Sequence, residues 1–301
     1  MSRLAFAALA SIVVSSAGAA QQVPGRDLLE FPIGLLAEPA PLSTQMGGGF
    51  WNPATAALGA DTVARIGFAG LTTPQDQGVR LEMASGAYRL RSSTSSSTTA
   101  SFSVVQASVS DIVRTETDPQ SVGSEIPYGT TLLSAGISQR RSFLEAGIDA
   151  RYRWAIADEQ HAQSFALDGG IVADRLGPIP VRVALSTFLF TPNRSQDAAT
   201  YSAAADLPLF RRDSTLAIRG GYSLSRTAGR GREGYSFASL RYAALEANGG
   251  VAETNIYGGS DRRWRFGIGL HYAGYTVAIG REDGAAGFGA STQFLLTRAF
   301  R

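Results

Sequence analysis

Most of the chain after residue 62 alternates apolar and polar residues with a period of two. In the stretch RRWRFGIGLHY, apolar side chains occupy every second position from Trp264 to Tyr272, and Arg263, Arg265 and small or polar residues lie between them. Alternate residues share one face of a β-strand but diverge around a helix, so this pattern predicts a strand. The stretch FLEAGIDARYRW alternates in the same way. The pattern therefore predicts an all-β protein.

About fourteen such strands fit between residue 62 and the end of the chain, each near the 9–11 residues that a tilted strand needs to cross a membrane. We place them at residues 62–70, 78–90, 98–113, 129–140, 143–154, 162–173, 179–190, 199–208, 214–224, 233–242, 245–256, 263–272, 274–281 and 286–300. An even number of strands brings both ends of a barrel to the same side of the membrane, as bacterial barrels require.

Two architectures share this alternation, a soluble β-sandwich and a transmembrane β-barrel. The apolar faces here end in Trp, Tyr and Phe, as do the aromatic girdles of membrane barrels. The opposite faces mix Gly, Ser and Thr with Arg, Asp and Glu, whereas a soluble surface is usually rich in Lys and Glu. We therefore predict a transmembrane antiparallel β-barrel over residues 62–301, with a soluble periplasmic β-protein as the alternative.

The polar faces of these strands carry charged residues that would point into the barrel lumen. They are Glu145, Asp149, Arg151, Arg153, Arg219, Arg263 and Arg265. A charge beside low-dielectric protein needs partners, which favours paired charges that fill the lumen. The alternative is a polar, anion-attracting constriction for a permeating solute.

The first twenty residues have the order of a secretory signal peptide. Arg3 precedes an apolar run from Leu4 to Val14, and small residues follow up to a cleavage site after Ala19 or Ala20. A single membrane anchor is disfavoured because the apolar run is shorter than the ~20 residues of a spanning helix. We therefore predict export, and residues 1–20 as a signal peptide.

Residues 21–61 lack the alternation of the barrel. One short helical turn is expected at Asp27–Glu30, before Pro32 interferes. The stretch GGGFWNPATAALG, residues 47–59, is expected to be extended or turning, because a residue before proline such as Asn52 is disfavoured in helical geometry.

The letters FWNPATAALG resemble the aromatic-Asn-Pro-Ala motif found just before the first barrel strand in FadL-like outer-membrane proteins, which include the PorV/PorQ family. In that family the N-terminal segment folds into the barrel as a hatch. The resemblance implies that Phe50, Trp51, Asn52, Pro53 and Ala54 are hatch residues, with the two aromatic rings against the inner wall. A plain connector that positions the first strand is the alternative for this segment.

The sequence offers little for catalysis, and we predict no enzyme, no cofactor and no metal site. The two histidines, His161 and His271, are far apart in the sequence, and no cysteine is present. No zinc-protease or hydrolase-elbow motif occurs. The charge is nearly balanced, with 27 Lys and Arg against 25 Asp and Glu, so no nucleic-acid partner is indicated.

The FadL-like resemblance implies passive uptake of small hydrophobic molecules across the outer membrane of a Gram-negative-type bacterium. The expected partners are outer-membrane lipid and a small hydrophobic solute. The PorV/PorQ resemblance implies instead a non-transporting adaptor or assembly component that acts through its surface loops. The loops are moderate in length and polar, which favours uptake.

Overall fold

The computed structural model describes residues 23–59, 61–74, 78–93, 95–114, 123–176, 178–191, 197–212, 215–229, 231–256, 259–284 and 289–301. The predicted signal peptide, residues 1–20, lies outside the described residues, so its prediction stays untested.

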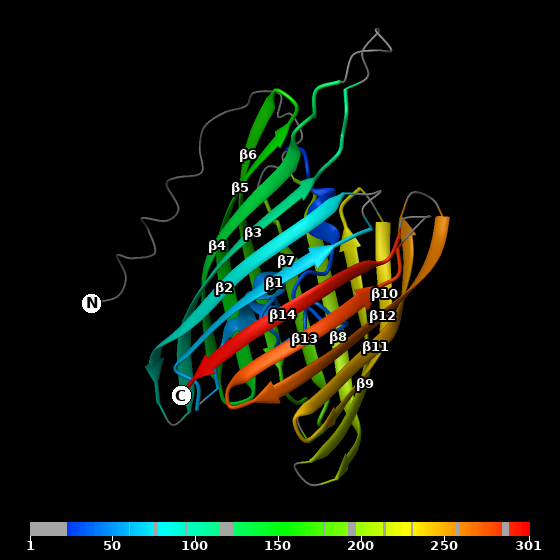
Figure 1. The fold of residues 1–301 in the computed structure, drawn as a ribbon. Coiled ribbons are helices and arrows are strands. Elements are labelled where there is room, and N and C mark those ends of the chain that lie inside the picture. Colours follow the sequence, from blue (N-terminus) through cyan, green and yellow to red (C-terminus); the bar gives the residue numbers. More distant parts are fainter. Residues whose placement is uncertain are drawn as a thin grey trace, which may run out of the picture.

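The chain forms a closed barrel of fourteen antiparallel strands, in which β1 pairs with β14 and every other strand pairs with its neighbours in sequence (Figure 1). The strands are β1 (Ala64–Thr72), β2 (Val79–Ser92), β3 (Ser96–Val109), β4 (Tyr128–Arg141), β5 (Leu144–Ala157), β6 (Gln160–Ala173), β7 (Arg182–Phe188), β8 (Thr200–Arg212), β9 (Leu216–Thr227), β10 (Gly231–Tyr242), β11 (Leu245–Ile256), β12 (Gly259–Tyr272), β13 (Tyr275–Glu282) and β14 (Ser291–Phe300). The predicted antiparallel barrel and its strand number are confirmed.

The two ends of the barrel differ in their connections. We call the end where β1 begins and β14 ends the short-turn end, because tight turns such as Ser142–Phe143 and Ala273–Gly274 join the strands there. We call the opposite end the loop end. It carries the long connection between β3 and β4, residues 110–127, and the connection between β7 and β8, residues 189–199. The predicted strands at residues 214–224 and 233–242 are too short at the loop end, because β9 continues to Thr227 and β10 begins at Gly231.

The Ser- and Thr-rich stretch at residues 89–99 is mostly strand. β2 extends to Ser92 and β3 begins at Ser96, so the connection at the short-turn end is short, not the long loop that its composition suggests. Inward hydroxyl groups explain why strand is favoured here. Thr99 accepts a hydrogen bond from the backbone N–H of Leu58 at 3.1 Å, and Ser97 donates one to the Leu58 carbonyl at 3.3 Å.

The outer surface of the barrel is apolar. Large apolar side chains are exposed on the outward positions of nearly every strand, and they include Ile66, Phe102, Ile137, Tyr152, Leu185, Tyr222, Trp264 and Phe294. A water-soluble protein rarely exposes a continuous apolar surface of this extent. Because the outward positions are apolar and the inward ones small or polar, the surface fits contact with lipid acyl chains.

Residues 23–59, which we call the inner segment, fold inside the barrel (Figure 1). The segment contains η1 (Asp27–Glu30), α1 (Gly48–Trp51) and η2 (Pro53–Ala56). The turn at η1 is confirmed. Asn52 has the extended geometry expected before proline, with φ −139° and ψ 108°. The short helical turns on either side of it fit the expected extended or turning path, and Gly48 lets the backbone turn directly against Ser43.

The inner segment supplies an apolar core that packs against one side of the wall. Buried side chains of the segment meet inward side chains of β1 to β4, and the cluster includes Leu28, Leu29, Ile33, Met46, Phe50, Leu71, Leu81, Met83, Val105 and Leu132. In the first half of β2, Leu81 and Met83 therefore face inward, while Arg80 and Glu82 face outward. Among the described residues, no helix is long and apolar enough to cross a membrane.

Candidate functional site

The Asn-Pro-Ala stretch is fixed to the inner wall by close backbone approach. The Asn52 side chain donates a hydrogen bond to the Pro41 carbonyl at 2.7 Å and accepts one from the Ala54 N–H at 3.0 Å. Two wall glycines make room for this turn. A Cβ at Gly147 would lie 2.4 Å from the carbonyl carbon of Pro53, and one at Gly170 would lie 1.8 Å from Asn52 Oδ1. Larger residues at these wall positions would therefore displace the motif.

The predicted aromatic pair lies beside a third ring from β7. The ring centroid of Phe50 is 5.2 Å from that of Trp51 and 5.3 Å from that of Phe188, and the Trp51 and Phe188 centroids are 4.7 Å apart. The indole N–H of Trp51 donates to the Ile33 carbonyl at 3.1 Å. Phe50 is buried and Trp51 is half-buried. The structure thus places Phe50 and Trp51 against the inner wall at β7.

Arg151 joins the inner segment to the wall. Its Nε lies 2.5 Å from Asp168 on β6, and its Nη2 lies 3.3 Å from Asp149. The same guanidinium donates to the Phe50 carbonyl and lies over the Phe50 and Phe188 rings, 4.9 Å and 4.7 Å from their centroids. Because this charge is fully buried, its carboxylate partners and the stacked rings are needed to hold it.

Arg153 makes a second buried junction, two residues further along β5. It pairs with Asp197 of the connection between β7 and β8, and it donates to the carbonyls of Pro24 and Val23. Asp197 also accepts a hydrogen bond from Ser164 on β6. Arg153 therefore joins Asp197 to the inner segment, and Ser164 joins it to the wall.

The wall between β6 and β7 has a short hydrogen-bond ladder. β5 and β6 pair over fourteen positions, whereas β6 and β7 pair over four, from Gly170 to Ala173 on β6. Toward the loop end, the Asp168 carboxylate accepts from the N–H groups of Leu189 and Phe190 at 3.0 and 2.9 Å, and one backbone hydrogen bond runs from the Leu167 N–H to the Phe190 carbonyl. We call this stretch, residues 164–169 and 187–191, the β6–β7 seam.

Arg263 and Arg265 on β12 face the lumen on the other side of the barrel. Arg263 contacts Glu233 on β10 and lies 2.8 Å from Glu282 on β13, and Arg265 lies 3.0 Å from each of the same two carboxylates. The Arg265 guanidinium also lies 4.9 Å from the centroid of the Tyr235 ring. These side chains form a four-membered ionic cluster on the wall itself.

The two remaining predicted lumen charges lie in separate pairs. Arg219 on β9 lies 2.6 Å from Asp206 on β8, which also pairs with Arg182 at 2.9 Å. Glu145 lies 3.3 Å from Arg140 on the neighbouring strand. The structure thus places all seven predicted charged residues on the inner face, but divides them among several groups.

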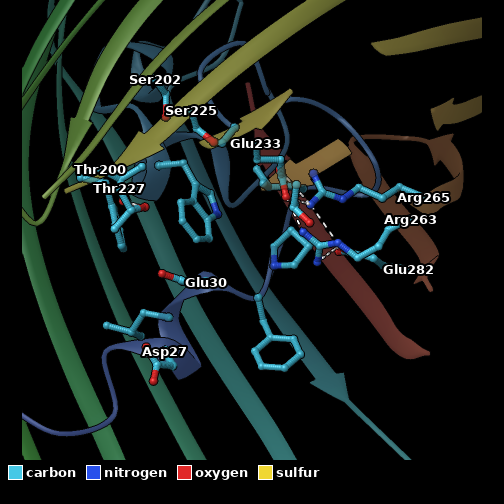
Figure 2. A pocket seen from close by; sticks show the side chains of 18 of the residues that line it. Asp27, Glu30, Thr200, Ser202, Ser225, Thr227, Glu233, Arg263, Arg265 and Glu282 are labelled. Atoms are coloured by element: carbon cyan, nitrogen blue, oxygen red, sulfur yellow. Dashed lines mark hydrogen bonds and ion pairs between the residues drawn. The ribbon is translucent and has the colours of Figure 1, made fainter. Parts of the chain in front are cut away.

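A cavity of about 500 Å³ lies at the loop end, between the inner segment and the wall from β8 to β14. Its inner side is apolar, formed by Phe31, Leu35, Trp51 and Phe188 among others. Figure 2 shows the hydroxyl groups of Thr200, Ser202, Ser225 and Thr227 on one side and the ionic cluster of Glu233, Arg263, Arg265 and Glu282 on the other. A volume of this size suits a small organic molecule.

A second cavity of about 300 Å³ lies beyond the inner segment toward the short-turn end, beside Leu58, Arg65, Glu145 and Arg182. Residues 42–58 separate the two spaces. The inner segment therefore divides the lumen into a loop-end cavity and a short-turn-end cavity.

Sequence reasoning missed most of the carboxylates that hold the lumen arginines. Asp168, Asp206, Glu233 and Glu282 stand at inward positions of their strands, so strict alternation would have found them. Asp197 lies in a connection, where no periodic signal exists. Among the described residues, no group of three or more His, Asp or Glu side chains could hold a metal ion. His161 lies on β6, and His271 lies within hydrogen-bond distance of Glu246, at 2.8 Å.

No protein-family model and no curated protein matches the chain. Among solved structures, the Acinetobacter baumannii outer membrane protein Omp33 is 12% identical, covering 81% of this chain and 100% of its own, with a TM-score of 0.49. Pseudomonas putida OprB at low pH is 10% identical, covering 87% and 100%, with a TM-score of 0.45. A mutant of the Rhodopseudomonas blastica porin is 9% identical, covering 79% and 98%, with a TM-score of 0.41.

At these identities no function carries over from the similar structures. The fold itself, a closed antiparallel barrel with an apolar outer surface, is that of a porin-like outer-membrane β-barrel.

Proposed function

We propose that this chain is an outer-membrane barrel for the passive uptake of small, largely apolar molecules. The observation that carries the proposal is the cavity of about 500 Å³ at the loop end, whose apolar floor is built by the same inner segment that divides the lumen. A segment that only positioned the first strand would not need to line a cavity. The position of Asn52, Pro53 and Ala54 inside the barrel supports the FadL-like resemblance and a hatch role for this stretch.

The β6–β7 seam supplies a route from the cavity toward the lipid. Phe188 lines the cavity and lies at the end of β7, next to the seam contacts of Asp168. Breaking these contacts costs less than separating a continuous ladder, because fewer backbone hydrogen bonds join the two strands. A solute would enter among the outer loops, settle on the floor of the cavity and leave through the seam when the inner segment shifts.

An engineered disulfide across the β6–β7 seam tests this route. The chain has no native cysteine, so the two introduced thiols can pair only with each other within the chain. Leu167 and Phe190 are exposed on the outer surface, and the Leu167 N–H donates to the Phe190 carbonyl at 2.9 Å. In liposomes, the oxidised double variant Leu167→Cys/Phe190→Cys should slow uptake of a fluorescent apolar probe severalfold, and reduction should restore it.

The matched control is Tyr152→Cys/Phe165→Cys, whose residues lie directly opposite each other in the continuous β5–β6 ladder. Its disulfide should leave uptake unchanged. Equal uptake by the oxidised and reduced seam variant would reject the lateral route, and no uptake by the wild type would reject the transport function.

An adaptor or assembly component of the PorV/PorQ type is the second candidate. The observation that favours it is the β3–β4 connection, whose described part continues as a paired projection beyond the barrel wall, with a bridge between Val113 and Glu125 (Figure 1). Val113 is exposed on this projection. No uptake by the wild type, together with loss of a co-purifying protein when the projection is removed, would support the adaptor over the transporter.

A further inference from the structure

Four arginines belong to the described lining of the loop-end cavity. Three of them, Arg26, Arg263 and Arg265, are already held by carboxylates of the protein, while Arg232 is exposed at the loop-end start of β10. The cavity has two arginines on β12, but both are already held by Glu233 and Glu282 at distances of 3.0 Å or less. A carboxylate on the ligand would have to displace a protein carboxylate that is fixed by the wall. The four side chains on this wall are each charged, but their charges cancel, so the ionic cluster has no net charge.

Arg26 of the inner segment is committed in the same way. Its guanidinium lies 3.7 Å from Glu30, and it donates to the Ala198 carbonyl at 3.2 Å and to Thr200 Oγ1 at 2.9 Å. These contacts tie the inner segment to the β7–β8 connection and to β8. Using Arg26 to bind an anionic ligand would break that attachment.

The remaining charges of the cavity are mostly negative. Asp27, Asp261 and Asp283 also belong to the described lining, which holds more carboxylates than guanidinium groups. Burial raises the pKa of Glu30 above its ordinary value, so this part of the cavity already disfavours one negative charge. A further carboxylate would add repulsion and lose its hydration.

The neutral polar groups of a ligand, in contrast, find hydrogen-bond partners on the cavity wall. Thr200, Ser202, Ser223, Ser225 and Thr227 place hydroxyl groups of β8 and β9 along the cavity (Figure 2). A hydroxyl group both donates and accepts hydrogen bonds, so it can pair with an alcohol or carbonyl without a charge partner. Trp51 and Phe188 also line the cavity and offer aromatic rings to an apolar body.

We propose that the loop-end cavity selects neutral molecules with an apolar, ring-sized body and one hydroxyl or carbonyl group, and discriminates against carboxylates of the same shape. This proposal rests on the proposed uptake function and names the substrate class of the same site.

Trp51 provides the readout, because the chain has three tryptophans and the other two, Trp154 and Trp264, are exposed on the outer surface. In the variant Trp154→Phe/Trp264→Phe, the fluorescence of Trp51 reports contact with a brominated ligand, since bromine quenches on contact. The matched probes are 4-bromobenzyl alcohol and 4-bromobenzoate, titrated at neutral pH into the detergent-folded barrel. The variant Trp51→Phe/Trp154→Phe keeps only Trp264 and measures quenching from the detergent phase.

The alcohol should quench Trp51 saturably, and the benzoate should bind at least about tenfold more weakly, a difference of roughly 1.4 kcal/mol. Asp27→Asn/Glu30→Gln should narrow this gap, whereas Glu253→Gln, a carboxylate that pairs with Arg262 outside the lumen, should not.

Equal or tighter binding of the benzoate would overturn the substrate class and leave the uptake function standing. Saturable quenching by neither probe, in a barrel shown to be folded, would overturn the uptake site itself. The two failures are therefore distinguishable.

Discussion

The walls at β5 and β12 carry the same local sequence but use it differently. Both have two inward arginines separated by an outward aromatic residue, Arg151 and Arg153 on β5 and Arg263 and Arg265 on β12. On β5 the arginines bind backbone carbonyls of the inner segment, Asp168 in the β6–β7 seam and Asp197 in the β7–β8 connection. On β12 they bind carboxylates of neighbouring strands and face a cavity.

The difference shows that the partner, not the motif, decides what a lumen arginine does. The β5 pair attaches the inner segment, because its guanidinium groups lie between this segment and the wall. The β12 pair leaves space beside it, because Glu233 and Glu282 satisfy its charge within the wall itself. The same residue pattern thus forms an attachment on one side of the barrel and the border of a cavity on the other.

Removal of one arginine from each wall should give the largest difference in stability between the two walls. Arg153→Met would strand Asp197 and two carbonyls in a buried site, which should destabilise the folded barrel by about 3–5 kcal/mol. Arg265→Met should cost less, about 1–3 kcal/mol, because Arg263 still pairs with both carboxylates. Urea unfolding of the detergent-folded protein measures both.

Arg262→Met is the matched control, since Arg262 pairs with Glu253 on the exposed outer surface and should contribute less than about 1 kcal/mol. Equal losses for Arg153→Met and Arg265→Met would contradict the distinction between the two walls.

The barrel was largely predictable because alternation is a local property. The strands that contain Trp154 and Trp264 follow from period-two patterns that any closed or half-buried sheet must keep. Alternation also identified seven of the charged residues that face inward, Arg151 and Arg265 among them. It could not tell that the apolar face of β2 points inward at Leu81 and Met83, because this depends on the inner segment that packs there.

The arrangement of the candidate site depended on contacts distant in sequence. Arg153 meets Asp197 forty-four residues away and Val23 one hundred and thirty residues away, and no local pattern encodes either pairing. The Asn-Pro-Ala motif indicated an ordered segment before β1, but the cavity above it appears only when residues 26–41 and β8 to β14 are brought together. The family resemblance could therefore suggest that the segment is a hatch, but not that the segment forms the floor of a cavity.

A smaller effect is expected from pH, which should change how strongly the inner segment is held in the barrel. Burial, with the nearby charge of Glu246, raises the pKa of Glu38 from 4.5 to about 7, and Ser43 donates to its carboxylate at 2.6 Å. Since the folded-state pKa is raised, the stability contribution is fully present below pH 4.5 and is lost as the pH rises through about 7. The inner segment should thus be held more weakly at pH 8 than at pH 5.

Urea unfolding followed by Trp51 fluorescence, in the Trp154→Phe/Trp264→Phe background, measures this effect at the two pH values. Glu38→Gln should reduce the loss of stability between them, while the exposed control Glu253→Gln should leave it unchanged. An identical pH dependence for wild type and Glu38→Gln would contradict the role of this carboxyl.

Single-channel conductance in a planar bilayer tests most directly whether the inner segment closes the lumen. Wild-type protein is compared with a variant that lacks residues 23–56, after heat-modifiable migration has shown that both barrels are folded. The account predicts near silence from the wild type and large, discrete openings from the shortened variant. Equal conductance from the two folded proteins, whether both open or both silent, would contradict it.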